Sequence, residues 1–464
     1  MAIPAMPPFI PTMPYEGDVS VFGTFGPFLI PVEFQGWREE VKSWKDGAYL
    51  GAFLSLSPTY RVKGPDAERF FAEHFVNNFA NLKVGGSRHG IMCDAQGRIM
   101  MDGTVLRVAD DEYIAIWLSP YIQYAFEQGG YDAAGEDLTG REFLFQIAGP
   151  RSLEILEQAT GSDLHDIAFT RHRPAAIAGT NVRVYRLGMA GGLGYEVHGQ
   201  IPDAAQVYDT IWAAGQPLGM RKLGSRAYLM NHTEDGFPQA YMHYPYPWFE
   251  DPGFAAWLDQ RGPQASFMML APRLWGSAGD DLAKRYVTPF DTGWENRIHW
   301  DHEFTGKAAL ALIAASPPRT VVTLEWNAED IADVHASQYR GLDEEPFMPL
   351  DLTGPSDVMY DSGTPDPATA RPKTKDYHAD LVLTPDGQEI GISAGRIAST
   401  TYRRMISLAF IGRAHADLGT ALVVLWGTPG TRQKPIRATV ARFPYLTDER
   451  NDKIDVEQIP HYAK

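Results

Sequence analysis

The sequence of 464 residues contains a single cysteine, Cys93. One thiol cannot form an internal disulfide, and it cannot supply the ligands of an iron–sulfur cluster or a cysteine-rich zinc site. Nothing in the neighbouring sequence activates this thiol, so we expect Cys93 to be a small core residue. The sequence also lacks a G-x-G-x-x-G dinucleotide fingerprint and a P-loop.

Basic residues are scarce as well. The chain has 41 Lys and Arg against 58 Asp and Glu, which gives a formal net charge of −17. Nucleic-acid binding needs clustered Lys and Arg to neutralise phosphates, so we expect no nucleic-acid partner. No run of about 18 uncharged apolar residues occurs, so we expect no membrane-spanning segment. Residues 1–17 have neither a basic region nor a continuous apolar core, which predicts a cytoplasmic protein without a signal peptide.

The composition that remains is that of a globular enzyme-sized protein. Hydrophobic residues make up 44% and charged residues 21%, which is enough to bury a large core. Apolar periodicity and capping residues predict helices and strands in mixed order. The expected helices are residues 65–75, 151–158 and 204–215, and the expected strands are residues 97–108 and 112–118. This order predicts an α+β fold with antiparallel sheets, not a doubly wound nucleotide-binding fold.

A composition change near Ser316-Pro317-Pro318 predicts a domain boundary, with domains at 1–317 and 318–464. Residues 341–376 are rich in Pro, Asp and Gly, and we expect an irregular excursion or lid there. Short β-like runs separated by turn residues are typical of a small barrel. These runs are residues 320–326, 381–383, 390–397, 404–411 and 421–426. The second domain is therefore predicted to be a β-barrel.

The segment 186–197 (RLGMAGGLGYEV) is a glycine-dense turn that leads into an apolar strand. Its glycines let the backbone approach a flat ligand closely. Glu196, between Tyr195 and Val197, is costly to bury unless a pair of hydrogen-bond donors meets its carboxylate. A pterin ring offers such a pair, an amino group beside a ring N–H. The alternative is an ordinary hairpin with a solvated glutamate.

This segment resembles R-T-G-Y-T-G-E-D-G-F-E-I of the folate-dependent aminomethyltransferase (glycine-cleavage T-protein) superfamily. Five further segments resemble that superfamily in the same order, at residues 53–71, 97–105, 149–150, 304–310 and 391–403. The resemblance implies a folate-binding domain of ferredoxin-like modules around a central channel, followed by a C-terminal barrel. It also implies tetrahydrofolate as co-substrate, with Glu196 as the pterin anchor. The other cofactor-binding residues that it implies are Arg186, Gly194, Tyr195 and Arg226.

One region departs from the glycine-cleavage enzymes. Their R-D-S-L-R-L-E-A-G is replaced by residues 226–234 (RAYLMNHTE), in which the second arginine has become Met230. The following residues, 235–248 (DGFPQAYMHYPYPW), are densely aromatic. Both features resemble the tetrahydrofolate-dependent aryl O-demethylases that act on vanillate and syringate. The implied reaction transfers the methyl group of a methoxylated aromatic acid to N5 of tetrahydrofolate, which yields a phenol and 5-methyltetrahydrofolate.

That reaction needs a proton donor for the departing phenolate oxygen, which a tyrosine or histidine can supply. We expect Tyr244 or His243 to be the donor, with Tyr241, Tyr246 and Trp248 lining the substrate pocket. The alternative is that this Tyr-Pro-rich segment is structural packing.

Asp102 corresponds to an acidic residue of the T-protein strand, and could hold the pterin or take up the N5 proton. It could equally be a turn aspartate before Gly103. No metal is required, and the spacing of His, Asp and Glu in residues 299–303 matches no standard metal site.

A substrate carboxylate would need an arginine, because the planar guanidinium binds carboxylates through two hydrogen bonds. Arg61 is assigned to this role, with Arg88 and Arg98 as alternatives, although an ordinary salt bridge would explain each. Residues 117–121 contain no basic residue, which weakens the case for a vanillate-like carboxylate. Two other functions stay open: demethylation of a sulfonium compound or methylated amine in an aromatic cage, and folate binding without turnover.

Overall fold

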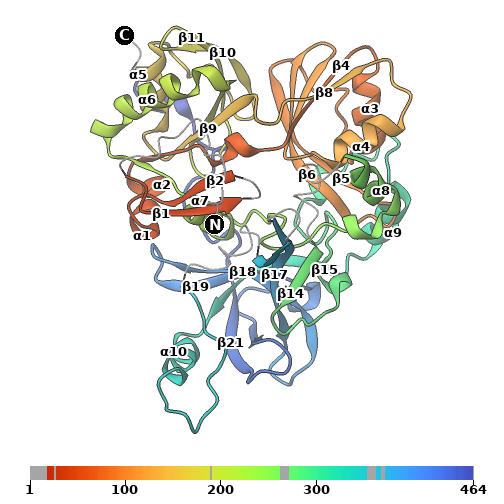
Figure 1. Cartoon of the computed structure of the whole chain (residues 1–464), viewed down its shortest axis with the longest axis vertical. Helices are drawn as coiled ribbons and strands as arrows, with labels where there is room; N and C mark the ends of the chain where they lie inside the picture. The colour runs from red at the N-terminus through yellow and green to blue at the C-terminus, as the bar shows by residue number, and fades with distance from the viewer. Residues whose placement is uncertain are drawn as a thin grey trace, which may run out of the picture.

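The computed structural model describes residues 18–25, 28–188, 191–261, 271–352, 362–366 and 371–462. Two lobes, each built on an antiparallel-rich sheet, lie side by side above a β-barrel (Figure 1). A short hairpin of β1 (Val21–Phe25) and β2 (Phe28–Glu33) precedes them. The α+β fold class predicted from the sequence is therefore confirmed.

The first lobe is a six-stranded sheet with helices on one face. Its strands, in spatial order, are β10 (His172–Ile177), β11 (Thr180–Tyr185), β12 (Gly194–Gln200), β9 (Glu142–Ala148), β3 (Ala48–Gly51) and β13 (Met220–Lys222). Helices α5 (Ser152–Thr160) and α6 (Ala204–Gly215) share an apolar core with this sheet. Side chains alternate along β12, so Tyr195 and Val197 enter that core while Glu196 faces the opposite side.

The second lobe is a five-stranded sheet. Its strands, in spatial order, are β5 (Gly86–Cys93), β6 (Ile99–Ala109), β7 (Glu112–Ile116), β4 (Thr59–Lys63) and β8 (Ala134–Asp137). The helices of this part of the chain are α3 (Ala67–His74), α4 (Tyr121–Gln128), α8 (Pro252–Arg261) and α9 (Lys307–Ala315). The predicted helices at 65–75, 151–158 and 204–215 and the predicted strands at 97–108 and 112–118 all match elements of the two lobes.

The C-terminal sheet closes into a barrel. Six strands close it because β17 pairs with both β18 and β20. They are β15 (Arg319–Trp326), β17 (Arg371–Leu383), β18 (Glu389–Ser399), β19 (Arg404–Gly412), β20 (Ala421–Trp426) and β21 (Lys434–Ala441). Helix α10 (Ala328–Ser337) projects from the barrel (Figure 1). The predicted barrel is confirmed, although β21 was missed because its exposed charged residues weaken the apolar pattern.

The excursion predicted at 341–376 is only partly irregular. Residues 353–361 and 367–370 lie outside the described residues, but β16 (Ser362–Asp366) pairs with β17, and β17 begins within the excursion. Strand β14 (Ala271–Trp275) also pairs with β17, although it precedes the predicted boundary at 317. Hydrogen bonds to distant strands satisfy the backbone N–H and C=O groups of this Pro-rich segment. The local sequence could not indicate such long-range pairing. The two-domain division itself remains a prediction.

Helix α7 (Ser225–Asp235) lies between the lobes and the barrel, and ten of its 11 residues are buried. It packs against β2, β18 and β19. Short helices α1 (Trp37–Glu40) and α2 (Ser43–Asp46) lead into this region. The fully buried carboxylate of Glu40 accepts N–H bonds from Phe34 and Gln35 and, at 2.7 Å, from Gly224, which precedes α7. Glu40 therefore fixes where α7 begins.

Glu40 predicts a measurable pH effect on stability. Burial raises the pKa of Glu40 from 4.5 to about 6 in the folded protein, despite the three N–H donors. Its contribution to stability is therefore full below pH 4.5 and is lost as the pH rises through 6. A shift of this size corresponds to about 2 kcal/mol. In Glu40→Gln, the free energy of unfolding should decline less between pH 4.5 and 7.5 than in the wild type. The free energies of unfolding come from chemical denaturation at each pH. If the values for wild type and Glu40→Gln ran parallel across this pH range, this role of Glu40 would be contradicted.

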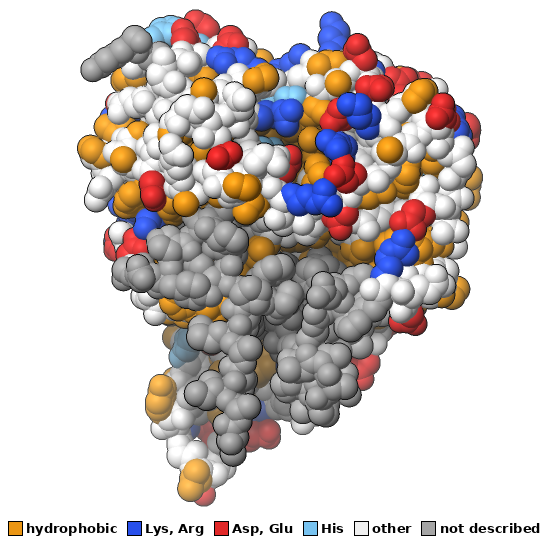
Figure 2. Space-filling view, turned by 45° about the horizontal axis from the view of Figure 1, so that its top comes forward, with side chains coloured by type: hydrophobic (Ala, Val, Ile, Leu, Met, Phe, Trp, Pro, Cys, Tyr) orange, Lys and Arg blue, Asp and Glu red, His pale blue; other side chains and the backbone are white. Residues whose placement is uncertain are grey.

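Two observations concern the surface and possible membrane-spanning helices. On the face shown in Figure 2, basic side chains are interspersed with acidic ones. Among the described residues, no helix is both long enough and apolar enough to cross a membrane.

Candidate functional site

Two adjoining cavities lie where β6, α7 and the segment 237–246 meet. The smaller one, which we call the inner cavity, has a volume of about 90 Å³. The larger one, which we call the outer cavity, has a volume of about 420 Å³. His89, Thr104 and Phe237 line both. The other residues of the inner cavity are Met101, Asp102, Gly103, Trp117, Tyr228, His232, Gln239, Ala240, Tyr241 and Tyr246. No Lys or Arg is among the described residues that line it. The inner cavity is thus aromatic, with one acidic group.

Asp102 on β6 is the centre of a hydrogen-bond network. Its Oδ1 accepts the hydroxyls of Tyr244 at 2.6 Å and Tyr246 at 2.8 Å, and its Oδ2 lies 2.9 Å from His89 Nε2. Tyr246 also accepts the backbone N–H of Asp102 at 3.2 Å. Asp102 is therefore a tightly held carboxylate at the wall of the inner cavity, not a solvated turn residue.

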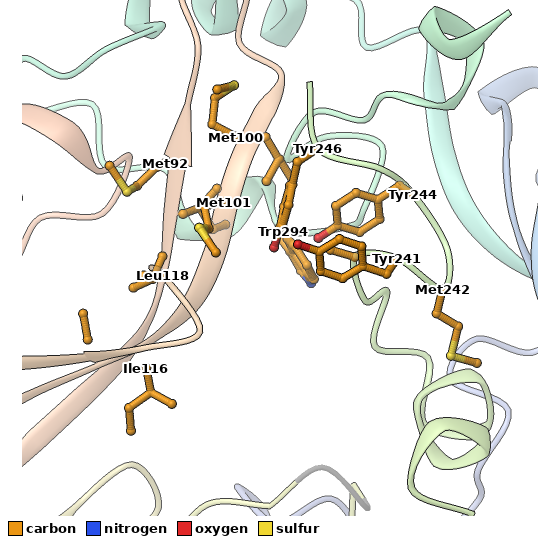
Figure 3. Packing of buried hydrophobic residues seen from close by; sticks show 14 of the residues in the cluster. Met92, Met100, Met101, Ile116, Leu118, Tyr241, Met242, Tyr244, Tyr246 and Trp294 are labelled. Carbon is orange, nitrogen blue, oxygen red and sulfur yellow. The ribbon is translucent and has the colours of Figure 1, made fainter. Parts of the chain in front are cut away.

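Three tyrosines approach β6 from the segment after α7. Tyr241, Tyr244 and Tyr246 gather beside the strand of Met101, and the hydroxyls of Tyr241 and Tyr244 point toward it (Figure 3). Burial raises the pKa of each well above its ordinary value, so all three stay protonated and can donate. Tyr241 adopts φ 68° and Trp117 adopts φ 65°. Left-handed backbone at bulky residues is strained, and such strain concentrates at functional sites.

The inner cavity also contains acceptors without partners among the described residues. These atoms are His89 Nδ1, His232 Nε2 and Gln239 Oε1. His232 Nδ1 lies 3.1 Å from the carbonyl oxygen of Tyr228 and must donate to it, which leaves Nε2 as an acceptor. Burial lowers the pKa of His232 to about 4, so the ring is neutral at pH 7. Buried acceptors without partners suit a ligand that brings O–H or N–H donors.

The outer cavity is cationic. Arg88, Arg297 and Arg450 line it, with Asp235 as its one acidic residue among those described. Arg450 pairs with Asp235, whereas the Arg297 guanidinium stacks over Phe237 and Trp294. Burial lowers the pKa of Arg297 to about 10, which leaves it charged at neutral pH. The outer cavity can therefore bind an anionic ligand.

Glu196 lies just behind the wall of the outer cavity. It is buried on β12 opposite Tyr185, which lines that cavity. Its carboxylate accepts from His198 Nε2 at 2.9 Å and from Gln146 Nε2 at 3.3 Å. The alternative of an ordinary hairpin with a solvated glutamate is wrong, because the side chain of Glu196 is only 6% exposed. Its role as pterin anchor remains a prediction.

The structure does not bring two of the predicted catalytic residues to the cavities. His243 is buried, with Nε2 3.1 Å from the Thr233 hydroxyl and Nδ1 accepting from Gln239 N–H, and it contacts Gly395 of the barrel. Burial lowers its pKa to about 3, so the ring is neutral, and its one hydrogen, on Nε2, is donated to Thr233. Tyr244 reaches Asp102 but does not line the inner cavity. Direct proton donation by either residue therefore remains a prediction, and neither residue lines the inner cavity.

Several predicted binding residues also lie elsewhere. Arg186 contacts Asn451 and the carbonyl of Ile454, and Arg226 pairs with Glu33. Gly194 packs against Ala148 on the neighbouring strand, and Tyr195 enters the core of the first lobe. None of the four lines either cavity, because Tyr195 points to the core side of β12 and the two arginines are held by these other partners.

Of the four predicted substrate-binding residues, two line the inner cavity and two do not. Tyr241 and Tyr246 line the inner cavity. Trp248 instead donates to the carbonyl of Met100 at 2.6 Å and stacks on Tyr246. Arg61 pairs with Glu136 and Glu112 in the second lobe and lines neither cavity, so its substrate role remains a prediction.

Sequence reasoning missed His89, His232, Gln239 and Arg297. Two of them, His232 and Gln239, lie within residues 226–248, on which the resemblance to the aryl O-demethylases rests. Buried polar residues along a whole helix, as in α7, are a signal that could have found His232.

Comparison with known proteins agrees with this architecture. Residues 15–243 match the GCVT N-terminal domain family. The chain is 48% identical over 450 residues, 97% of each chain, to the sesamin methylene transferase of Sinomonas sp. (strain No.22). It is 28% identical over 453 residues, 92% of each chain, to the syringate O-demethylase of Sphingobium sp. (strain NBRC 103272 / SYK-6).

Among solved structures, aminomethyltransferase T of the glycine cleavage system from Bartonella henselae superposes with a TM-score of 0.65 at 16% identity. The match covers 93% of this chain and 95% of that one, and it shows the shared fold. The alternative of a folate-binding protein without turnover is set aside, since these relatives are named as enzymes. The chain is therefore an enzyme that belongs to the tetrahydrofolate-dependent aminomethyltransferase superfamily of the glycine-cleavage T-protein.

Proposed function

We propose that the protein transfers the one-carbon unit of a neutral aryl ether to tetrahydrofolate, with the methylene bridge of a methylenedioxyphenyl compound as the preferred donor. The observation that carries this proposal is the pairing of the two cavities. The inner one is aromatic and contains no cation among its described lining residues, whereas the outer one is lined by three arginines. The relative named for sesamin, a lignan with methylenedioxyphenyl rings, supports this donor class.

In this proposal the folate supplies an amine that accepts the one-carbon unit. Arg88, Arg297 and Arg450 would hold its carboxylates in the outer cavity. Aromatic walls in the inner cavity would hold the flat aryl ring in fixed register with that amine. Positioning of this kind can contribute roughly 7–11 kcal/mol to lowering the barrier.

The residues of the inner cavity supply the proton transfers. Two bonds between oxygen and the methylene carbon break, two C–N bonds form at N5 and N10 of tetrahydrofolate, and the two protons that these nitrogens lose end on the catechol oxygens. As each C–O bond breaks, the Tyr241 hydroxyl can donate to the departing oxygen, since its raised pKa keeps it protonated. Asp102 can take up the proton that each nitrogen loses and return it to Tyr241. Loss of one methylene bridge yields two hydroxyls, and the acceptors His232 Nε2 and Gln239 Oε1 suit such groups. No net oxidation or reduction is required.

A second candidate is methyl transfer from a methoxylated aromatic acid to N5, as the sequence predicted. Arg297 supports it, because the guanidinium lies near Asp102 and no salt bridge joins it to a described carboxylate. The relative named for syringate supports it too. A vanillate, syringate or 3-O-methylgallate substrate would then place its carboxylate toward the outer cavity.

One experiment separates these reactions. Purified protein is incubated anaerobically with tetrahydrofolate and each of sesamin, 1,3-benzodioxole, syringate, vanillate and a methylated amine. Mass spectrometry then measures the folate product and the phenol. We expect 5,10-methylenetetrahydrofolate and a catechol from the methylenedioxy compounds. Formation of 5-methyltetrahydrofolate from syringate or vanillate alone would favour the second candidate. Turnover of only the amine would reject both.

A further inference from the structure

Four metal-ligating side chains meet far from both cavities, at the end of the first lobe. Glu157 at the end of α5, Asp163 and His165 in the following loop, and His461 near the C-terminus each offer one ligand atom, and these atoms all lie within 4.8 Å of one another. Glu157 and His165 are buried, whereas Asp163 and His461 are exposed. Figure 1 shows the C-terminus beside α5. The cluster thus joins segments about 300 residues apart.

The contacts of both ring nitrogens of His165 suit a metal ligand. Its Nε2 lies 3.1 Å from the carbonyl oxygen of Ile459, so Nε2 carries a hydrogen. In the neutral ring, the lone pair of Nδ1 then faces Glu157 Oε1 at 2.9 Å and Asp163 Oδ1 at 3.1 Å. Backbone N–H groups of Leu164 and His165 donate to these two oxygens at 2.8 Å and 2.9 Å, and the remaining lone pairs converge with Nδ1 on a point that a cation can occupy. A histidine whose second nitrogen donates to a backbone carbonyl is the usual arrangement at metal sites.

His461 completes the set. Its Nδ1 lies 2.9 Å from Asp163 Oδ2, and its ring stacks on that of His165 with centroids 3.8 Å apart. Two protonated rings stacked at this distance would repel each other, whereas two neutral rings that share one metal ion would not.

We propose that Glu157, Asp163, His165 and His461 bind one divalent transition-metal ion, with zinc as the best match to two nitrogen and two oxygen ligands. Zinc–ligand bonds of about 2.0–2.2 Å place tetrahedral ligand atoms roughly 3.3–3.6 Å apart. Since the ligand atoms all lie within 4.8 Å of one another, no pair needs to close by more than roughly 1–1.5 Å. The exposed side chains of Asp163 and His461 can make this movement.

The site would stabilise the first lobe through the C-terminal segment. Asn451 of that segment donates to the carbonyl of Gly194 at 3.0 Å and accepts from Arg186. Its backbone N–H also donates to the carbonyl of Gly191 at 2.8 Å. A metal ion that anchors His461 therefore also anchors the glycine turn that leads into β12 and Glu196.

The test uses the full chain without an affinity tag, stripped with EDTA and titrated with Zn²⁺ by isothermal calorimetry. We expect one ion per chain and a rise in the melting temperature. Asp163→Asn and His461→Ala change exposed side chains and should each weaken zinc binding at least tenfold. His335→Ala on α10 is the matched control and should leave binding unchanged. Absence of saturable binding, or equal affinity in all variants, would overturn the proposal and leave His165 in an ordinary ion pair.

Discussion

Replacing Asp102 with asparagine is expected to slow the one-carbon transfer step by at least roughly 100-fold, the low end of proton-transfer catalysis. The wild-type carboxylate receives two tyrosine hydroxyls and faces His89 Nε2. Asparagine has the same shape, and the neutral His89 ring can move its hydrogen to Nδ1 and accept from the amide. Burial lowers the pKa of His89 to about 4, which supports the neutral ring. Packing is thus retained, and the negative charge that accepts the proton is lost.

The measurement is a single-turnover rate at saturating folate and aryl ether, with the melting temperature as a check on folding. Tyr244→Phe is the control, since Tyr244 donates to the same oxygen from outside the inner cavity. We expect the single-turnover rate of this variant to fall by tenfold or less. If Tyr244→Phe were as slow as Asp102→Asn, Tyr244 would itself be the proton donor that the sequence predicted. If the single-turnover rate of Asp102→Asn fell by less than tenfold, Asp102 would not be the group that takes up the proton.

Replacing His232 with leucine is expected to weaken binding of the phenolic product tenfold to 100-fold, and to change the Kd of folate less than threefold. His232 Nε2 is a buried acceptor that lines only the inner cavity. A hydroxyl that loses this partner stays buried and unsatisfied, which costs about 1–3 kcal/mol. Equilibrium titration of catechol and folate with each protein measures both constants.

His243→Gln is the matched comparison. This residue is an equally buried histidine that contacts Thr233 and the barrel instead of the cavity. Its replacement should lower the melting temperature while product affinity in the folded protein stays within threefold of the wild type. If the folate Kd rose in His232→Leu instead, the pterin and not the aryl ring would occupy the inner cavity. Loss of product binding in His243→Gln alone would restore the sequence-based assignment.

The positions of helices, strands and the barrel followed from local patterns. Periodicity, capping and turn residues located α3, α5, α6, β6, β7 and most barrel strands, because these signals act within one element. The resemblance then indicated the correct superfamily, because its fragments occur in the right order along most of the chain. It also singled out Asp102, Tyr241 and Tyr246, which the structure brings to one cavity.

The sequence by itself determined the fold class, the superfamily and the aromatic segment that approaches β6. Only the tertiary structure decided which neighbouring side chains face the cavity. In the segment 241–246, Tyr241 and Tyr246 line it, whereas His243 turns toward the barrel. Adjacent residues point to different sides of a backbone, and the side that becomes a cavity depends on packing between lobes and barrel. The same packing joins Arg88, Arg297 and Arg450 from distant parts of the chain, a contact that no local pattern encodes.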